Sequence, residues 1–369
     1  MSDIVIGLSK SARAGYSFDD VAVAPHRRTR DPQTVDLTWT IDAYTFDLPI
    51  LAAPMDSIVS PDTAVAMGEA GGLAVLNLEG LWTRYADPAE ALQQIRSVPR
   101  HEAVALLQRL YAEPVKPELI GERVAQIRDA GITVAASLSP HKTQALAQHV
   151  LSAGVDIFVI RGTTVSAEHV SAEQEPLNLK QFIYELDVPV LVGGVATYQS
   201  ALHLMRAGAA GVLVGFGGGA SHTTADVLGV RVPMATAVAD VAAARRDYLD
   251  ESGGRYVHVV ADGAMGRSGD IVKAVACGAD AVMVGSPLAR ATDSPGGGRH
   301  WGMEATHAEL PRGEVVEFET VGTWQEVLFG PSRVSDGIMN LAGALRRSIA
   351  LCGYSDLKSF QRVEMVVSR

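Results

Sequence analysis

GVLVGFGGGASHTT, residues Gly211–Thr224, joins a short apolar run to a glycine-rich turn that ends in two threonines. The run Val212–Val214 predicts a short buried β-strand. Gly217–Gly219 let the backbone approach a ligand with its N–H groups unobstructed, and the threonine hydroxyls add donors. We interpret the stretch as a strand that leads into an anion-binding loop, with a plain glycine hinge as the alternative.

The same pattern recurs further along the chain. Ala209–Gly215, AAGVLVG, is matched by Ala279–Gly285, ADAVMVG. Each copy follows a glycine, Gly208 or Gly278, of the kind that ends a helix in the left-handed conformation. In a parallel barrel, turns of this kind meet at the C-terminal face, where the loops after strands 7 and 8 commonly hold phosphate. The repeat therefore predicts neighbouring strands with glycine-rich turns at one end.

Apolar segments of strand length, separated by helical patterns, indicate the fold class. They do not alternate with polar residues, as expected for a parallel sheet covered on both faces. An α/β fold with this many units favours a single-domain (β/α)8 TIM barrel over an open doubly wound sheet, and no GxGxxG follows the first strand. The eight predicted strands are Ile50–Ala53, Leu73–Leu78, Thr133–Leu138, Asp156–Ile160, Val190–Val192, Val212–Val214, Val257–Ala261 and Ala281–Val284.

The barrel is expected to carry additions. Residues 1–48, with short extended stretches such as Ser17–Val21, are predicted to cap a barrel formed by residues 49–369. Residues 81–128 contain several helical patterns, which predict a helical insert between strands 2 and 3. Residues 291–321, rich in Gly, Pro and His, follow strand 8 without a clear pattern. A long irregular loop inside a compact domain is usually functional, so we expect a lid.

Composition and charge narrow the class of function. A chain of 369 residues that is 47% hydrophobic suits a large core. The net charge of −11 argues against a nucleic-acid or anionic membrane surface but permits a phosphorylated ligand, which needs only local donors. Cys277 and Cys352 lie in helical patterns without metal or redox spacing, and no apolar run has the length of a signal or a membrane span. We expect a cytoplasmic protein that binds neither nucleic acid nor membrane.

Short motifs occur in order along almost the whole chain. They are SFDDV at Ser17–Val21, APMD at Ala53–Asp56, GVAT at Gly194–Thr197, the Gly215–Thr224 loop, ADG at Ala261–Gly263, SGDI at Ser268–Ile271, VGS at Val284–Ser286 and LAGAL at Leu341–Leu345. Together these motifs resemble the IMP dehydrogenase/GMP reductase family. In detail the chain is similar to short bacterial IMP dehydrogenase-related proteins that lack the CBS module, and residues 81–128 occupy its place. The resemblance implies an NAD(P)-linked oxidoreductase that acts on IMP, XMP or GMP, a homotetramer, and a potassium site formed by carbonyls of the Gly217–His222 loop.

The resemblance also implies a purine nucleoside monophosphate across the C-terminal mouth of the barrel. Asp262 would accept hydrogen bonds from the ribose hydroxyls, with an ordinary Asp-Gly turn as the alternative. Met55 and Met303 would line the base pocket. The phosphate would be held by Gly217, Gly218, Gly219, Gly263, Gly285 and Ser286.

The family's catalytic cysteine has no counterpart here. Its position, two residues before Thr224, is occupied by His222. A thiolate attacks and leaves easily, whereas neutral imidazole would give a cationic adduct, so the family's thioimidate chemistry is not expected in its ordinary form. We interpret His222 either as a replacement acid/base group or purine donor, or as a polar loop residue that bonds backbone.

Other positions also depart from the family. Arg161 stands where the family has the aspartate that contacts the nicotinamide ribose, so it is the candidate cofactor-binding residue. Glu304 joins His222 and Thr224 as a candidate catalytic residue, and the Arg-Tyr base of the family's flap has no clear copy in His307–Arg312. No histidine-bound metal site is expected, because the spacing of His258, His300 and His307 fits no ligand pattern.

Three functions are compatible with these residues. The first is an oxidoreductase that works without the cysteine. The second is a non-catalytic purine-nucleotide sensor, or a partner of an authentic IMP dehydrogenase. The third is a flavin-binding barrel, against which the APMD motif and the Gly217–Thr224 loop both speak.

Overall fold

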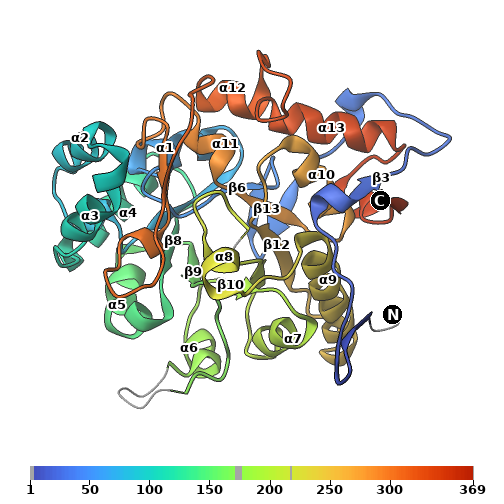
Figure 1. Ribbon diagram of the computed structural model, residues 1–369, viewed down its shortest axis with the longest axis horizontal. Helices are drawn as coiled ribbons and strands as arrows, with labels where there is room; N and C mark the ends of the chain where they lie inside the picture. The colour runs from blue at the N-terminus through green and yellow to red at the C-terminus, as the bar shows by residue number, and fades with distance from the viewer. Residues whose placement is uncertain (1–3, 171–176, 217, 369) are drawn as a thin grey trace.

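The computed structural model describes residues 4–170, 177–216 and 218–368. Parallel strands form a closed barrel that helices surround (Figure 1). Neighbouring strands follow the chain in order, and β13 pairs with β6 to close the ring. The barrel strands are β6 (Ile50–Ala52), β7 (Leu73–Asn77), β8 (Ala135–Leu138), β9 (Ile157–Arg161), β10 (Val190–Val195), β11 (Gly211–Val214), β12 (His258–Asp262) and β13 (Ala281–Val284).

The strands are buried on both faces, as their unbroken apolar runs predict. The predicted (β/α)8 barrel is therefore confirmed, with each predicted strand present and small shifts at the ends. Gly208 and Gly278 follow α7 and α10 with φ of 106° and 116°, so these helices end as expected. The surrounding helices are α1 (Pro61–Glu69), α4 (Pro117–Asp129), α5 (Pro140–Ala153), α6 (Leu179–Tyr184), α7 (Tyr198–Arg206), α9 (Met234–Glu251), α10 (Ser268–Ala276) and α13 (Leu341–Leu351).

The N-terminal segment packs on α10 through β3, and on the barrel end where β12 begins, through Trp39 against His258. Instead of the extended stretch expected at Ser17–Val21, residues 18–20 form a 3-10 turn, because Asp20 accepts a hydrogen bond from the Ser17 amide at 2.7 Å. The C-terminal strand β16 (Met365–Val367) pairs antiparallel with β3. The other elements here are β1 (Ile4–Gly7), β2 (Lys10–Ala12), η1 (Phe18–Asp20), β3 (Val21–Val23), η2 (Pro32–Thr34), β4 (Trp39–Ile41) and β5 (Tyr44–Phe46).

The interval between β7 and β8 is helical. It contains η3 (Leu81–Thr83), α2 (Ala89–Ser97), α3 (Arg100–Leu110) and α4. Helix α4 contacts α1 and α5, so it belongs to the ring of barrel helices. The addition to the barrel is therefore residues 81–116, which we call the insert.

The segment after β13 is more regular than expected. It contains α11 (Ser286–Ala289), β14 (Arg299–Trp301), η4 (Met303–Ala305) and β15 (Val315–Glu317), and β14 pairs antiparallel with β15. The strands are too short for a visible sequence period, and they form because Trp301 and Val315 pair and are both buried. We call residues 299–317 the flap hairpin. The chain then continues through α12 (Trp324–Phe329), α13 and α14 (Leu357–Phe360).

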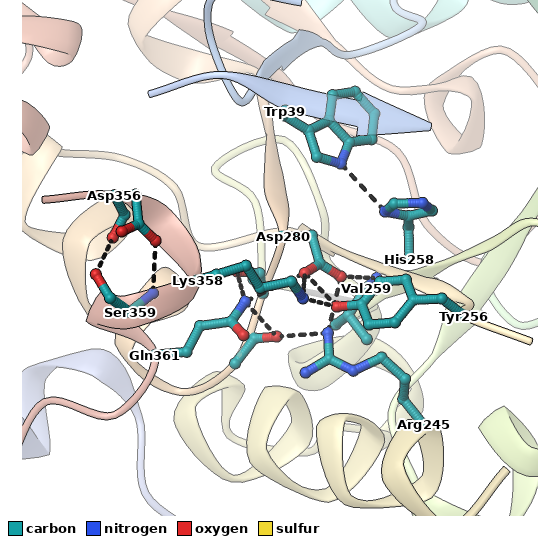
Figure 2. Close-up of polar contacts among 12 residues, drawn as sticks. Trp39, Arg245, Tyr256, His258, Val259, Asp280, Asp356, Lys358, Ser359 and Gln361 are labelled. Atoms are coloured by element: carbon teal, nitrogen blue, oxygen red, sulfur yellow. Dashed lines mark hydrogen bonds and ion pairs between the residues drawn. The ribbon is translucent and has the colours of Figure 1, made fainter. Parts of the chain in front are cut away.

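A polar network surrounds the Asp280 side chain, directly before β13 (Figure 2). The buried Asp280 carboxylate binds Arg245 Nη1 at 2.8 Å, Tyr256 Oη at 2.7 Å and Lys358 Nζ at 2.8 Å. Trp39 Nε1 donates to His258 Nδ1 at 3.3 Å beside it. The network ties α14 and β4 to the start of β12 and β13, which leaves the other end for ligands. Among the described helices, none is both long and apolar enough to cross a membrane.

Candidate functional site

Two adjoining cavities, each of about 480 Å³, open at the C-terminal mouth of the barrel. We call one the glycine lobe, because Gly263, Gly285 and Ser286 line it, and the other the flap lobe, because Met303 and Glu304 line it. Both lobes share one wall, which contains Arg161, His222, Asp262 and three of the glycines among the expected site residues. Its residues are Arg161, Phe216, Gly218, Gly219, His222, Asp262 and Gly263.

The turns after β11, β12 and β13 converge on the glycine lobe. A Cβ added to Gly218 would lie 3.3 Å from the Ala264 amide nitrogen, so the first two turns are in contact. A Cβ on Gly285 would lie 3.8 Å from the His300 ring, which places the third turn at the same cavity. Ala264 has φ of 57°, a conformation that non-glycine residues adopt rarely and often at functional sites. Gly217, also expected here, lies outside the described residues.

The two methionines expected at a base pocket lie in different lobes. Met55 is 5% exposed and lines the glycine lobe, beside the third turn. Met303 lines the flap lobe, where Asn77 Nδ2 donates to its sulfur at 3.2 Å. A base held by both residues would have to lie near the wall that the lobes share.

The loop after Gly219 presents polar groups without partners. Ser221 Oγ, His222 Nδ1, Thr223 Oγ1 and Thr224 Oγ1 are buried and make no hydrogen bond within the described part of the chain. Thr224 is also the first residue of α8 (Thr224–Leu228). Buried polar groups in proteins are nearly always bonded, so a cluster of this kind indicates a ligand or water position.

His222 and Glu304 face each other across the mouth. His222 Nε2 lies 3.8 Å from Glu304 Oε1, and Thr163 Oγ1 donates to the same carboxylate oxygen at 3.3 Å. Burial lowers the pKa of His222, although the Glu304 carboxylate opposes this. We conclude that the imidazole is neutral near pH 7, when it can accept a proton.

Cations keep the facing carboxylate ionised. Burial raises the pKa of Glu304, but neighbouring charges outweigh it and the pKa falls below its ordinary value. The largest influence that lowers this pKa is the His222 ring when it is protonated, and Arg161 and Arg312 add to it, with Arg312 Nη2 3.6 Å from Glu304 Oε1. The mouth thus contains a proton acceptor opposite a fixed negative charge.

Arg161 and Asp262 bind each other within the shared wall. Arg161 Nε donates to Asp262 Oδ2 at 3.0 Å, and the two side chains are 18% and 11% exposed. Sequence reasoning assigned Arg161 to a cofactor and Asp262 to a ribose. The structure brings both to the mouth, with one carboxylate oxygen of Asp262 already occupied by the arginine.

Sequence reasoning missed His300 and Arg312 as site residues. His300 Nδ1 lies 3.0 Å from Ser57 Oγ, its ring borders the glycine lobe, and burial lowers its pKa to about 3. Arg312 contacts Glu304 from the far side of the flap hairpin. The only available signal was their place in the segment after strand 8, beside Met303.

The thiols and the candidate metal ligands lie elsewhere. Cys277 and Cys352 end α10 and α13, neither lines a lobe, and burial raises the pKa of Cys277 to about 12. No group of three or more His, Cys, Asp or Glu side chains within residues 4–170, 177–216 and 218–368 could hold a metal ion. For the expected potassium site, the Gly219 carbonyl already accepts the His222 amide at 3.0 Å. That site stays a prediction.

Comparison with known proteins identifies the family of this chain. The IMP dehydrogenase/GMP reductase domain matches residues 15–313. An uncharacterized oxidoreductase from Mycolicibacterium smegmatis is 51% identical over 99% of both chains. An inosine-5'-monophosphate dehydrogenase from Methanocaldococcus jannaschii is 24% identical over 95% of this chain and 92% of its own.

A solved structure supports the same family. The crystal structure of an IMP dehydrogenase/GMP reductase-like protein from Corynebacterium glutamicum superposes with a TM-score of 0.94. It is 50% identical and covers 99% of this chain and 98% of that one. The chain belongs to the IMP dehydrogenase/GMP reductase family.

Proposed function

We propose that the chain binds a purine nucleoside monophosphate in the glycine lobe and acts as an NAD(P)-linked oxidoreductase on IMP, XMP or GMP. The observation that carries the proposal is the convergence of the turns after β11, β12 and β13 on one cavity. At the mouth of a (β/α)8 barrel, such turns offer backbone N–H groups to a phosphate. The choice of a purine nucleotide as substrate and of a nicotinamide cofactor rests on the chemistry of the family.

Different residues of the glycine lobe would bind the ribose, the base and the phosphate of the nucleotide. The second carboxylate oxygen of Asp262 would accept ribose hydroxyls, and Met55 would contact the base. The phosphate would lie at the positive end of the backbone dipoles of the turns, where N–H groups point outward. The residues that would hold it are Gly217, Gly218, Gly219, Gly263, Gly285 and Ser286.

Proton transfer would involve His222, on the shared wall, and Glu304, which faces it from the flap lobe. Neutral His222 would accept a proton, and the Glu304 carboxylate would stabilise the imidazolium that forms. Thr224, whose hydroxyl is unpaired but which lines neither lobe, would act through the loop that carries His222. This arrangement replaces a nucleophilic thiol with acid/base catalysis.

The flap lobe fits a second ligand. It is large enough for part of a dinucleotide, and buried Arg312 Nε has no partner within the described residues. When bound, NAD or NADP supplies the hydride donor or acceptor. Arg161 and Arg312 would hold its anionic groups by charge-assisted hydrogen bonds.

A non-catalytic sensor is the second candidate. Two observations favour it: no cysteine lines either lobe, and Arg161 already occupies Asp262. Both features affect chemistry and the cofactor more than they affect phosphate binding. Such a protein would bind the nucleotide without turnover, or would act as a partner of an authentic IMP dehydrogenase.

Calorimetry and absorbance test the two candidates together. We expect IMP, XMP or GMP to bind, and then measure absorbance at about 340 nm with each nicotinamide cofactor, since turnover separates an oxidoreductase from a sensor. Ser286→Asp places a negative charge at the phosphate position and should weaken binding by about 100-fold or more. Ser200→Asp, on α7 outside the mouth, is the charge-matched control. Unchanged binding in Ser286→Asp would refute the phosphate site. Light scattering tests the expected homotetramer.

A further inference from the structure

The insert and the flap hairpin share a hydrophobic core separate from that of the barrel. Helices α2 and α3 supply most of it, and the hairpin supplies the rest. The insert therefore does more than pad the barrel surface, because the hairpin buries its apolar side chains against it. The buried residues are Leu81, Ala91, Leu92, Ile95, Ala103, Leu106, Leu107 and Tyr111 from the insert, and Trp301, Ala305 and Val315 from the hairpin.

A buried hydrogen-bond chain runs through this core. Trp301 Nε1 donates to Tyr111 Oη at 3.0 Å, and Tyr111 Oη donates to Asp56 Oδ2. Asp56 belongs to the APMD motif after β6, and its Oδ2 also accepts the Leu81 amide at 2.8 Å. The Tyr111 hydroxyl therefore links the hairpin to the barrel at a site from which water is excluded.

Backbone contacts add to the attachment. Arg299 Nη1, on β14, donates to the Ile95 carbonyl of α2 at 2.5 Å. Arg96 Nε, on α2, donates to the Pro295 carbonyl before β14 at 2.8 Å. The insert thus holds the hairpin from both its core and its edge.

The hairpin carries the carboxylate that faces His222. Glu304 lies on η4, directly after Trp301 and Met303, and its polar contacts are with Thr163, Arg312 and the His222 ring. Thr163 and His222 belong to the barrel and contact η4 only through the Glu304 side chain, and the backbone hydrogen bonds given for η4 lie within residues 302–306. The position of the carboxylate depends on where the hairpin is held.

We propose that the insert positions Glu304 against His222, and that Tyr111 is the positioning residue that transmits the constraint. The insert would thereby hold closed a segment that could otherwise leave the mouth. Tyr111 touches neither lobe, so it acts through Trp301. The proposal concerns the free protein and needs no bound nucleotide.

Tyr111→Phe tests this by removing the bridging hydroxyl while it keeps the ring in the core. The matched control is Tyr85→Phe, because the Tyr85 hydroxyl donates to the Leu110 carbonyl within the insert. We expect hydrogen exchange in residues 299–317 to become about tenfold faster in Tyr111→Phe only, since a buried hydrogen-bond chain is lost. Exchange in α7 and α9 should not change.

The pKa of His222 is the second readout, because a general loss of stability would not change it. It is measured by NMR titration, and the His222 signal is assigned by its absence in His222→Gln. Glu304, Arg161, Asp262 and Arg312 face the ring, and burial is the largest influence on its pKa. In Tyr111→Phe the pKa should rise toward 6.5 as water reaches the ring, whereas Glu304→Gln should lower it further. If Tyr111→Phe does not fold, Trp301→Phe removes the donor at the other end of the chain. Unchanged hairpin exchange, or an unchanged His222 pKa, would overturn the proposal.

Discussion

Arg161 binds Asp262 across the wall that the two lobes share, with Nε 3.0 Å from Oδ2. The two side chains come from β9 and β12, which are not neighbours in the barrel, so the pair spans the mouth. It neutralises the carboxylate that the family resemblance assigns to a ribose. Whether a nucleotide displaces the arginine determines how the mouth binds it.

Arg161→Met should destabilise the free protein and increase the stabilisation that a bound nucleotide provides. Removing the arginine leaves a mostly buried carboxylate unpaired, so the free energy of unfolding should fall by about 1–3 kcal/mol. IMP should then raise the melting temperature of the variant more than that of the wild type, because both oxygens of Asp262 become available. Thermal unfolding with and without IMP measures both effects.

Arg206→Met is the control for that experiment. Arg206 binds Glu251 at 2.6 Å, but both side chains are about half exposed, so solvent screens the pair and its loss should change the stability little. Equal stabilisation of wild type and Arg161→Met by IMP would contradict the assignment of Asp262 to the ribose.

His222→Cys should introduce the missing nucleophile. The position lies at the shared wall, so a thiolate there would meet a base bound in the mouth. We expect the nucleotide-dependent rate of change in nicotinamide absorbance to be about tenfold or more higher than in wild type. A tenfold rate increase corresponds to an activation free energy lower by about 1.4 kcal/mol. His222→Ala controls for loss of the imidazole. If the Cys and Ala variants behave alike, the absent thiol is not what limits turnover.

The barrel could be predicted because its signals are local. Apolar runs such as Val212–Val214 specify buried parallel strands, and glycines such as Gly278 mark where helices end. The convergence of the turns then follows from the topology of a parallel barrel, in which all carboxyl ends point the same way.

The contacts within the mouth and those between the insert and the flap hairpin could not be predicted, because they join distant residues. Arg161 and Asp262 are 101 positions apart, and Tyr111 and Trp301 are 190 apart. Each pair depends on how loops pack after the barrel has formed, and neither leaves a spacing in the sequence. The flap hairpin escaped prediction for a related reason, since three-residue strands show no period.

Arg245 and Lys358 should contribute unequally to the network around Asp280 (Figure 2). Their side chains are 9% and 57% exposed, although both bind the carboxylate at 2.8 Å. Arg245→Met should lower the free energy of unfolding by about 3 kcal/mol, because it leaves a buried charge without its buried partner. Lys358→Met should lower it by less than about 1 kcal/mol, since solvent screens the exposed pair. Denaturant unfolding of both variants measures the order, and the reverse order would be inconsistent with burial as the cause.

Asp56→Asn should change how stability depends on pH. Burial raises the pKa of Asp56 from 3.8 to about 6, so the folded protein binds this proton more tightly than the unfolded chain does. The resulting stabilisation is complete below about pH 4 and is lost as pH rises through about 6, a difference of up to about 3 kcal/mol. Asparagine keeps the acceptor for Tyr111 and Leu81 but cannot ionise. The variant should therefore gain stability relative to wild type at pH 7 and gain little at pH 4.

Denaturant unfolding between pH 4 and pH 7 separates this effect from a general change in packing. A packing effect would shift stability equally at each pH, whereas ionisation makes the difference between variant and wild type grow across that window. Asp226→Asn, at an exposed site on α8 where no buried carboxylate is removed, is the control and should leave the profile unchanged. A constant difference for Asp56→Asn would mean that the carboxylate is already ionised when folded at pH 4, and that the chain from Asp56 to Trp301 does not depend on its protonation.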